Sequence, residues 1–406
     1  MDETTASTGC IIVGGGPGGV LLALLLARKG VEVTLLEMHR DFDRDFRGDT
    51  VHASTLEVLD QIGLAEPLHA LPHAKLQRMQ FNTSERVINL ADLSRLETKF
   101  PYVMIMPQSL FLGFLCEQAE KNPGFHRIMG AQVVDLLREG DAVIGVRYRR
   151  DGEDHELRAP LIVAADGRFS RLRKIVGFEG RSLSPPTDIA WLRVSRRADD
   201  PGGGQGGAFY VRRGRFLVTL VRPAEWQIGY VFPKGDFHLL RERGIEEFRT
   251  SVAEVVPWLA DRVAEIGSFH DVHLLKVGAD RLPIWHLPGL LFIGDAAHVM
   301  SPVGGIGINY AIGDAVEAAN VLTGPLLEGK VGETHLAEVQ RRREKPTRRA
   351  QRLQALIQEN IVARSLGDRE FDLPLPARMA LKIPFLRDVP ARLIALGFGR
   401  LRLEAP

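Results

Sequence analysis

Runs of apolar residues and short turns divide the first forty residues into two strands and a helix. Residues 11–13 and 31–36 are rich in β-branched side chains, and residues 20–28 between them have the length and composition of a helix that ends at Gly30. A glycine-rich turn separates the first strand from the helix. The order strand, turn, helix, strand predicts a βαβ unit with a parallel sheet.

The rest of the chain changes its pattern several times. We expect a short helix over residues 55–62, a polar-interrupted strand pair over 78–90, and a strand, a proline stop and a helix over 101–121. Alternating residues predict antiparallel strands over 131–165 and an aromatic, hairpin-built sheet over 185–235. From about residue 331 the pattern is helical and basic, and it is then broken by prolines.

Composition fits a folded protein with a large core. The chain has 406 residues, of which 45% are hydrophobic and 25% charged, with a net charge of +1, so charge gives no case for a nucleic-acid partner. Cys10 and Cys116 lie in apolar runs and are expected to be buried free thiols, as in a reducing cytoplasm. The polar, acidic start does not resemble a secretory signal, and the run over residues 20–27 is too short to span a bilayer. We expect no metal site.

The glycine turn has the spacing of a dinucleotide-binding site. Gly14, Gly16 and Gly19 form G-x-G-x-x-G between the predicted strand and helix, so that backbone can approach a pyrophosphate at the helix N-terminus. Glu37 ends the second strand, where a carboxylate can accept hydrogen bonds from a ribose diol. The motif does not distinguish NAD from FAD, and a glycine turn without a ligand is the weaker alternative.

Two further motifs follow predicted strands. Asp166 and Gly167 open a D-G-x-x-S-x-x-R pattern that continues to Ser170 and Arg173. Gly294 and Asp295 precede the glycine-rich segment 302–309, whose backbone N–H groups at a helix N-terminus would stabilise negative charge on a ring. Each motif alone is weak, but three at strand ends in this order are a strong signal.

With these motifs, residues 9–325 resemble the class A flavoprotein monooxygenases, the family typified by para-hydroxybenzoate hydroxylase. The resemblance implies an α/β fold with a Rossmann-like FAD-binding domain, an inserted mixed or antiparallel sheet that binds substrate, and a C-terminal helical segment. We expect the FAD-binding domain to be discontinuous, over residues 1–75, 100–180 and 281–330. The substrate domain would comprise residues 76–99 and 181–280, and the helical region residues 331–406.

The resemblance also assigns roles to single residues. It implies backbone roles on the flavin side for Pro302, Gly305 and Gly307. It implies cofactor contacts for Arg47, near the pyrophosphate or ribityl chain, and for Gln108. The alternative for Arg47 is a solvated charge in an acidic loop, and the alternative for Gln108 is an ordinary helix-start residue. The full set of expected cofactor-binding residues is Gly14, Gly16, Gly19, Glu37, Arg47, Gln108, Asp166, Gly167, Gly294, Asp295, Gly307, Ile308 and Asn309.

The function implied is an FAD-dependent monooxygenase that uses NADH or NADPH and O₂ to hydroxylate an aromatic or lipophilic small molecule through a flavin C4a-hydroperoxide. The alternatives are a reductase, an oxidase or a halogenase on the same fold, or a non-catalytic flavin redox sensor. The tryptophan-halogenase signature W-x-W-x-I-P is absent, since the most similar text is LPIWHLPG. The sequence leaves the substrate, the choice of NADH or NADPH, and the oligomeric state open.

Three other features have two interpretations each. His298 invites a catalytic role, but a structural one is favoured. The aromatic residues of the second sheet are expected in the core more often than in a pocket; they are Trp191, Tyr210, Trp226, Tyr230 and Phe232. The basic, apolar tail 376–406 suits either peripheral membrane contact or packing on the enzyme, and packing is favoured because Pro384 and Pro390 keep its helices short.

Overall fold

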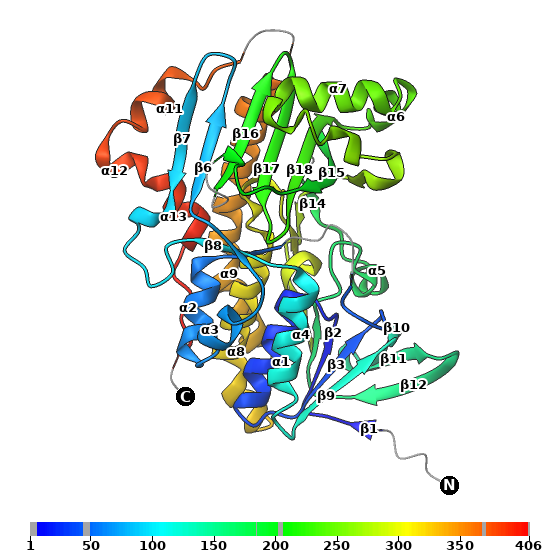
Figure 1. The fold of residues 1–406 in the computed structure, drawn as a ribbon. Coiled ribbons are helices and arrows are strands. Elements are labelled where there is room, and N and C mark those ends of the chain that lie inside the picture. Colours follow the sequence, from blue (N-terminus) through cyan, green and yellow to red (C-terminus); the bar gives the residue numbers. More distant parts are fainter. Residues whose placement is uncertain (1–5, 44–48, 184, 202–205, 368–370, 405–406) are drawn as a thin grey trace.

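The computed structural model describes residues 6–43, 49–183, 185–201, 206–367 and 371–404. Two halves are stacked along the long axis, with the helical and parallel-sheet half below and a large, mostly antiparallel sheet above (Figure 1). The α/β class expected from the sequence is confirmed. Among the described residues, no helix has the length and apolar character needed to cross a bilayer.

The lower half is built on a six-stranded sheet. Its central strands are parallel, and helices cover one face while a second, four-stranded sheet lies against the other (Figure 1). In spatial order the strands are β21 (His286–Leu287), β22 (Leu290–Phe292), β13 (Ile162–Ala164), β2 (Cys10–Val13), β3 (Val33–Glu37) and β9 (Phe125–Met129). The four-stranded sheet contains β1 (Ala6–Ser7), β12 (Glu153–Arg158), β11 (Ala142–Arg150) and β10 (Gln132–Glu139).

Strand β2 shows why this half is layered. Its four residues are all buried, and they alternate between two cores. Cys10 and Ile12 pack with the helices, whereas Ile11 and Val13 pack with the four-stranded sheet. A strand buried on both faces has the continuous apolar run seen in the sequence. The covering helices are α1 (Pro17–Arg28), α4 (Gln108–Ala119) and α8 (Gly307–Leu327).

The upper half is a seven-stranded sheet assembled from distant segments. Strand β6 (Arg78–Asn82) pairs in parallel with β16 (Gly206–Arg212), with Phe81 opposite Phe209. Residues of the first quarter of the chain thus complete a sheet made mainly by the middle. The remaining strands are β7 (Val87–Asp92), β17 (Arg215–Val221), β18 (Glu225–Pro233), β15 (Thr187–Ser195) and β19 (His273–Leu275). The outer face carries α6 (Phe237–Glu242) and α7 (Ile245–Val255) (Figure 1).

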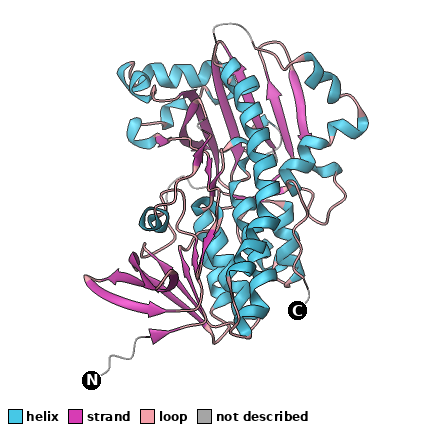
Figure 2. Ribbon diagram, turned by 180° about the vertical axis from the view of Figure 1, so that it is seen from behind, coloured by secondary structure: helices cyan, strands magenta, loops and turns pink. Residues whose placement is uncertain are grey.

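One long helix connects the halves. Helix α9 (Glu333–Ile357) runs along the back of the molecule past both sheets and continues into a π-helical turn, Gln358–Val362 (Figure 2). Smaller elements fill the remaining space. These are α2 (Ala53–Gln61), α3 (Ala65–His69), α5 (Arg171–Val176) and α10 (Ala363–Ser365), with the short strands β4 (Thr50–Val51), β5 (Ala74–Leu76), β8 (Val103–Ile105), β14 (Arg181–Ser182), β20 (Asp280–Arg281) and β23 (His298–Val299).

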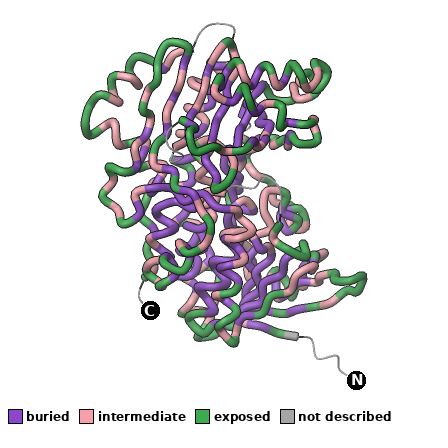
Figure 3. The backbone as a smooth tube through the Cα atoms, viewed as in Figure 1, coloured by how far each residue is buried: buried purple, intermediate pink, exposed green. Residues whose placement is uncertain are grey.

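The C-terminal tail has two parts with different burial. Helices α11 (Leu375–Ala380) and α12 (Pro384–Arg387) have no buried residue, and Figure 3 shows them in the colours of exposed and intermediate residues. Helix α13 (Val389–Leu396) buries Ala391, Ala395 and Leu396. The packing expected of the tail therefore holds for α13 and not for the two helices before it.

Candidate active site

Within the described part of the chain, a large cavity lies where the two halves meet. Its volume is about 1950 Å³, and it is lined by strand ends of the six-stranded sheet and by one face of the seven-stranded sheet. Typical ligand pockets measure about 300–1,000 Å³. The cavity therefore has room for a large cofactor and a second molecule together.

The glycine turn of the βαβ unit shapes one end of this cavity. A Cβ on Gly14 would lie 2.3 Å from the Ala165 carbonyl oxygen, and one on Gly19 would lie 2.1 Å from the Gly14 carbonyl oxygen. A Cβ on Gly16 would meet nothing within 4 Å, although Gly16 lines the cavity. Gly14 and Gly19 are thus required by the fold itself, whereas Gly16 leaves open space at the N-terminus of α1, where an anionic group is favoured.

Glu37 is held at the end of β3 by backbone donors. Its side chain is buried, and its two carboxylate oxygens accept hydrogen bonds from the Gly15 N–H at 2.7 Å and the His39 N–H at 2.9 Å. A carboxylate oxygen can accept more than one hydrogen bond. Glu37 also lines the cavity, so its fixed orientation is compatible with a further hydroxyl donor.

The Asp166 turn is a helix cap that faces the cavity. Asp166 Oδ2 accepts hydrogen bonds from the backbone N–H groups of Arg171 and Leu172 at the start of α5, while Oδ1 has no hydrogen-bond partner among the described residues. Burial raises the pKa of the Asp166 carboxyl, against the hydrogen bonds that lower it. The other motif residues are structural: Ser170 caps α5, and Arg173 forms a two-point contact with Asp280 at 3.2 Å.

A buried ionic cluster supports the Gly294 turn from behind. Asp314 on α8 accepts hydrogen bonds from the Gly294 N–H at 2.8 Å, from Arg343 Nε at 2.8 Å and from His298 Nε2 at 2.6 Å. Burial opposes the charge on Asp314, but His298 and Arg343 outweigh it, and the net effect is a lowered pKa. His298 is buried and does not line the cavity, in agreement with a structural role.

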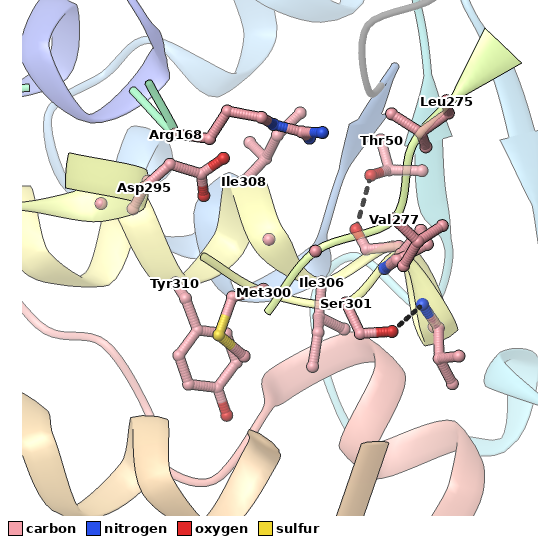
Figure 4. Close-up of a pocket in the computed structure, with 18 of the residues that line it drawn as sticks. Thr50, Arg168, Leu275, Val277, Asp295, Met300, Ser301, Ile306, Ile308 and Tyr310 are labelled. Atoms are coloured by element: carbon pink, nitrogen blue, oxygen red, sulfur yellow. Dashed lines mark hydrogen bonds between the residues drawn. The ribbon is translucent and has the colours of Figure 1, made fainter. Parts of the chain in front are cut away.

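The segment between β23 and α8 forms the cavity floor shown in Figure 4. Gly304 and Gly305 have φ values of +80° and +63°, which favour glycine. Thr50 Oγ1 donates to the Gly305 carbonyl at 3.0 Å, and the Val303 N–H donates to Ser301 Oγ at 3.3 Å (Figure 4). Helix α8 begins at Gly307, so its first N–H groups lack intrahelical partners at the cavity wall.

The structure brings most of the expected residues to this one cavity. Those that line it are Gly14, Gly16, Gly19, Glu37, Gln108, Asp166, Gly167, Gly294, Asp295, Pro302, Gly305, Gly307 and Ile308. Asn309 differs: its side chain does not line the cavity, and its Oδ1 accepts hydrogen bonds from Ser54 at 2.6 Å and Thr55 at 3.1 Å. Arg47 lies outside the described residues.

The other end of the cavity is an apolar wall. It is formed by the inner face of the seven-stranded sheet and by the end of α9, through Phe81, Trp191, Phe209, Phe216, Leu220 and Ile357. Of the aromatic residues considered from the sequence, only Trp191 lines the cavity. The others lie elsewhere, and ring contacts at 5.2–5.9 Å join Trp226 to Trp258, Tyr230 to Phe248 and Phe232 to Phe237.

Several cavity residues were not found from the sequence. His52 places its two ring nitrogens 3.0 Å from the Gly305 carbonyl and 2.6 Å from the Ile394 carbonyl, so it links the cavity floor to α13. Burial lowers the pKa of His52, against those two contacts. Asp49, Gln227 and Gln358 also line the cavity. Polar residues at buried strand positions were the available signal, as in EWQIGYVFP, where Gln227 shares the period-2 face of Val231.

The geometry fits one class of cofactor. Open space beside Gly16, the carboxylate of Glu37, an unpartnered oxygen on Asp166 and a helix N-terminus at Gly307 lie in one cavity. Together they suit a dinucleotide whose diphosphate lies at α1 and whose ring lies at α8. This arrangement defines a flavin-dependent oxidoreductase.

Comparison with known proteins identifies the family. Residues 7–354 match the family described as "FAD binding domain", and the chain belongs to this family of FAD-dependent monooxygenases. It is 32% identical over 402 residues to 6-methylpretetramide 4-monooxygenase of Streptomyces rimosus. The aligned region covers 98% of this chain and 95% of that relative. Two further relatives are longer, and the chain spans 62% and 59% of their length.

Solved structures share the fold. PqsL of Pseudomonas aeruginosa, in complex with 2-aminobenzoylacetate, matches with a TM-score of 0.78 and 20% identity, over 89% of this chain and 98% of that one. The flavin-dependent brominase Bmp2 matches with a TM-score of 0.75 and 16% identity, over 96% and 94%. Both likenesses concern the fold alone.

Among the described residues, no group of three or more His, Cys, Asp or Glu side chains is placed to hold a metal ion.

Proposed function

We propose that this FAD-dependent monooxygenase hydroxylates a planar aromatic compound of more than one ring, with a nicotinamide coenzyme as reductant. The observation that carries the proposal is that the apolar wall and the cofactor residues share one cavity. A pocket enclosed by Phe81, Trp191, Phe209 and Phe216 suits a flat apolar body. The relative at 32% identity is named for 6-methylpretetramide, so that compound is a first candidate.

The chain's own residues would bind, orient and enclose the reactants. The backbone around Gly16 and the N-terminus of α1 would hold the diphosphate, Glu37 a ribose, Asp295 and Gln108 the ribityl chain, and the N-terminus of α8 the ring. When bound, FAD supplies the redox chemistry with O₂. The apolar wall excludes water from the reacting atoms. Pro302, Gly305 and Gly307 would act through backbone position.

The reductant would dock at a basic rim. Arg168, Arg171, Lys174 and Lys276 line the cavity, and beside them Phe169 is 80% exposed. Cations beside an exposed ring complement a diphosphate joined to a flat base. Asp166 lies at the same turn. The Asp166→Ala variant should therefore slow flavin reduction by NAD(P)H more than it slows reoxidation by O₂, in stopped-flow measurements of the two half-reactions.

Turnover decides between this function and its alternatives. FAD-loaded protein is incubated with NADH or NADPH and a panel of phenols, naphthols and 6-methylpretetramide. The proposal requires substrate-stimulated NAD(P)H consumption with O₂ uptake and a product one oxygen atom heavier. A halide-dependent product would indicate a halogenase, and a hydrogenated product a reductase. A dehydrogenated product without NAD(P)H consumption would indicate an oxidase, and the absence of turnover with any reductant a redox sensor.

The proposal also includes a cytoplasmic location and a C-terminal tail that packs on the enzyme. Cys10 and Cys116 are buried free thiols, which supports a reducing cytoplasmic setting. We expect the tail to serve packing through α13, but α11 and α12 leave Leu375, Met379 and Phe385 more than half exposed. Co-sedimentation with anionic vesicles at low and high salt tests this. Salt-sensitive binding that is lost when Leu375, Met379 and Phe385 are replaced by serine would show peripheral membrane contact.

A further inference from the structure

The apolar wall of the cavity contains a glutamine, Gln227, whose amide oxygen is hydrogen-bonded and whose amide nitrogen is available to a ligand. Gln227 lies on β18, opposite Leu220 of β17, and both residues line the cavity. Its side chain is 6% exposed, so it is surrounded by protein. A polar side chain in a mostly apolar pocket wall can fix the orientation of a bound molecule, and Gln227 faces the cavity.

The orientation of this amide is fixed by a buried arginine. Arg222 Nη1 donates to Gln227 Oε1 at 2.9 Å. Because guanidinium groups only donate, the amide oxygen must face Arg222, and the amide NH₂ group must point away from it. That NH₂ group makes no hydrogen bond with any described residue.

Two carboxylates fix the position of Arg222. It is buried and forms ion pairs with Asp49 and, through Nε at 3.0 Å, with Glu225. Asp49 accepts a hydrogen bond from the Gln108 N–H at 3.3 Å, at the start of α4. The orientation of Gln227 is therefore set by a chain of contacts that reaches the expected cofactor side of the cavity.

The neighbouring residues give Gln227 a flat apolar surround. Gly229, two residues further along β18, leaves room for Trp191, since a Cβ there would lie 2.9 Å from the indole ring and 2.8 Å from Val218. Trp191 and Val218 both line the cavity. A flat ring system against this surface would bring an oxygen substituent to the amide.

We propose that the Gln227 amide nitrogen donates a hydrogen bond to a keto or phenolate oxygen on the substrate's ring system, and so selects and orients it. Gln227 is thus a specificity residue for planar aromatic compounds that carry an oxygen acceptor. The assignment rests on the proposed function and narrows its substrate class. A donor in an apolar wall disfavours an analogue without the acceptor, because the donor then stays unpaired.

The test compares two ligands that differ only in the acceptor. FAD-loaded protein is dialysed to equilibrium with 2-acetylnaphthalene or with 2-ethylnaphthalene, and bound ligand is quantified by chromatography. Wild type should bind the ketone roughly tenfold more tightly, the worth of one hydrogen bond of ordinary strength. In Gln227→Glu the carboxylate keeps its contact with Arg222 but offers no donor at neutral pH, so the preference should fall to parity or reverse.

A matched variant controls for the added charge. Gln80→Glu makes the same substitution on β6 of the same sheet, at a side chain that bonds Asn89 and does not line the cavity. It should keep the wild-type preference. Thermal melts and FAD content verify that each variant is folded. Equal binding or no binding of the two ligands by wild type, or an unchanged preference in Gln227→Glu, would overturn the proposal. Failure of the proposed function would appear separately, as absent oxygenated product in turnover assays.

Discussion

At the scale of single residues, the three glycines of the first turn have different tasks. A side chain on Gly14 would meet the backbone of Ala165 after β13, and one on Gly19 would meet the backbone of Gly14, so either would disturb the protein itself. Gly16 has ordinary extended backbone angles, with φ −77° and ψ 176°, and faces open space. Its lack of a side chain matters only to what enters the cavity.

The first prediction follows from this difference. Gly16→Ala should leave the stability of the cofactor-free protein unchanged but weaken FAD binding. An overpacked contact costs about 1–3 kcal/mol, which is roughly five- to more than a hundredfold in affinity. Fluorescence titration of the apoprotein with FAD measures the change. Gly324→Ala, within α8 and also in open space, is the control and should bind FAD normally. An unaltered affinity in Gly16→Ala would place the diphosphate elsewhere.

A second residue-scale prediction concerns acid stability. Asp200 accepts hydrogen bonds from Arg262 at 2.7 and 2.8 Å and from Trp226 at 2.7 Å. Burial alone would raise its pKa, but Arg262, the Arg197 N–H and Trp226 outweigh burial and lower the pKa to about 2. A depressed carboxyl pKa contributes stability above the unfolded value of 3.8, and this contribution is lost as pH falls towards 2.

Asp200→Asn should therefore reduce the free energy of unfolding by about 2 kcal/mol at pH 7. The difference from wild type should shrink below pH 4. Urea unfolding at pH 7, 4 and 3 measures it. Asp154→Asn, which removes an exposed partner of Arg149, serves as control and should change little at any of these pH values. A difference independent of pH would mean that packing, and not charge, accounts for the loss.

At the scale of elements, the C-terminal tail consists of helix α13, which packs on the protein, and helices α11 and α12, which have no buried residue. Leu396→Ala should lower the free energy of unfolding by about 2–4 kcal/mol, because Leu396 is buried in the main core. Phe385→Ala should have little effect, since that side chain is 75% exposed. Denaturant titration of both variants makes the comparison. Equal losses would show that α12 is packed as tightly as α13.

Elements with strong local patterns could be predicted from the sequence. The βαβ unit, the strand pair at 78–90 and the hairpin-built sheet at 185–235 all lie where periodicity placed them, because both faces or one face of each is buried. The contacts between distant elements could not be predicted. Nothing local specifies that Ile394 meets His52, that the Asn309 side chain turns to α2, or that Arg222 bonds Gln227, since each depends on how separate elements pack.

At the scale of the whole molecule, one cavity connects both halves, so its occupant should stabilise both. Purified protein should be yellow because it contains non-covalent FAD. Acid precipitation should release intact FAD into the supernatant. A ligand at 100 times its Kd adds about 2.7 kcal/mol to the free energy of unfolding. Calorimetry should show a single transition that moves upward with FAD. Two transitions, of which FAD moves only one, would show that the halves unfold independently.

The parallel pairing of β6 with β16 has a consequence for how the chain is made. Strand β6 lies within the first hundred residues, but its partner begins only at Gly206. At roughly 5–20 residues per second, a ribosome takes on the order of ten seconds to supply that partner. During this time the β6 edge of the β6–β7 hairpin, which β16 later pairs, is open outside the exit tunnel, with Phe81 uncovered. Nascent chains should therefore need chaperone protection until β16 emerges, and slower translation should lengthen their exposure.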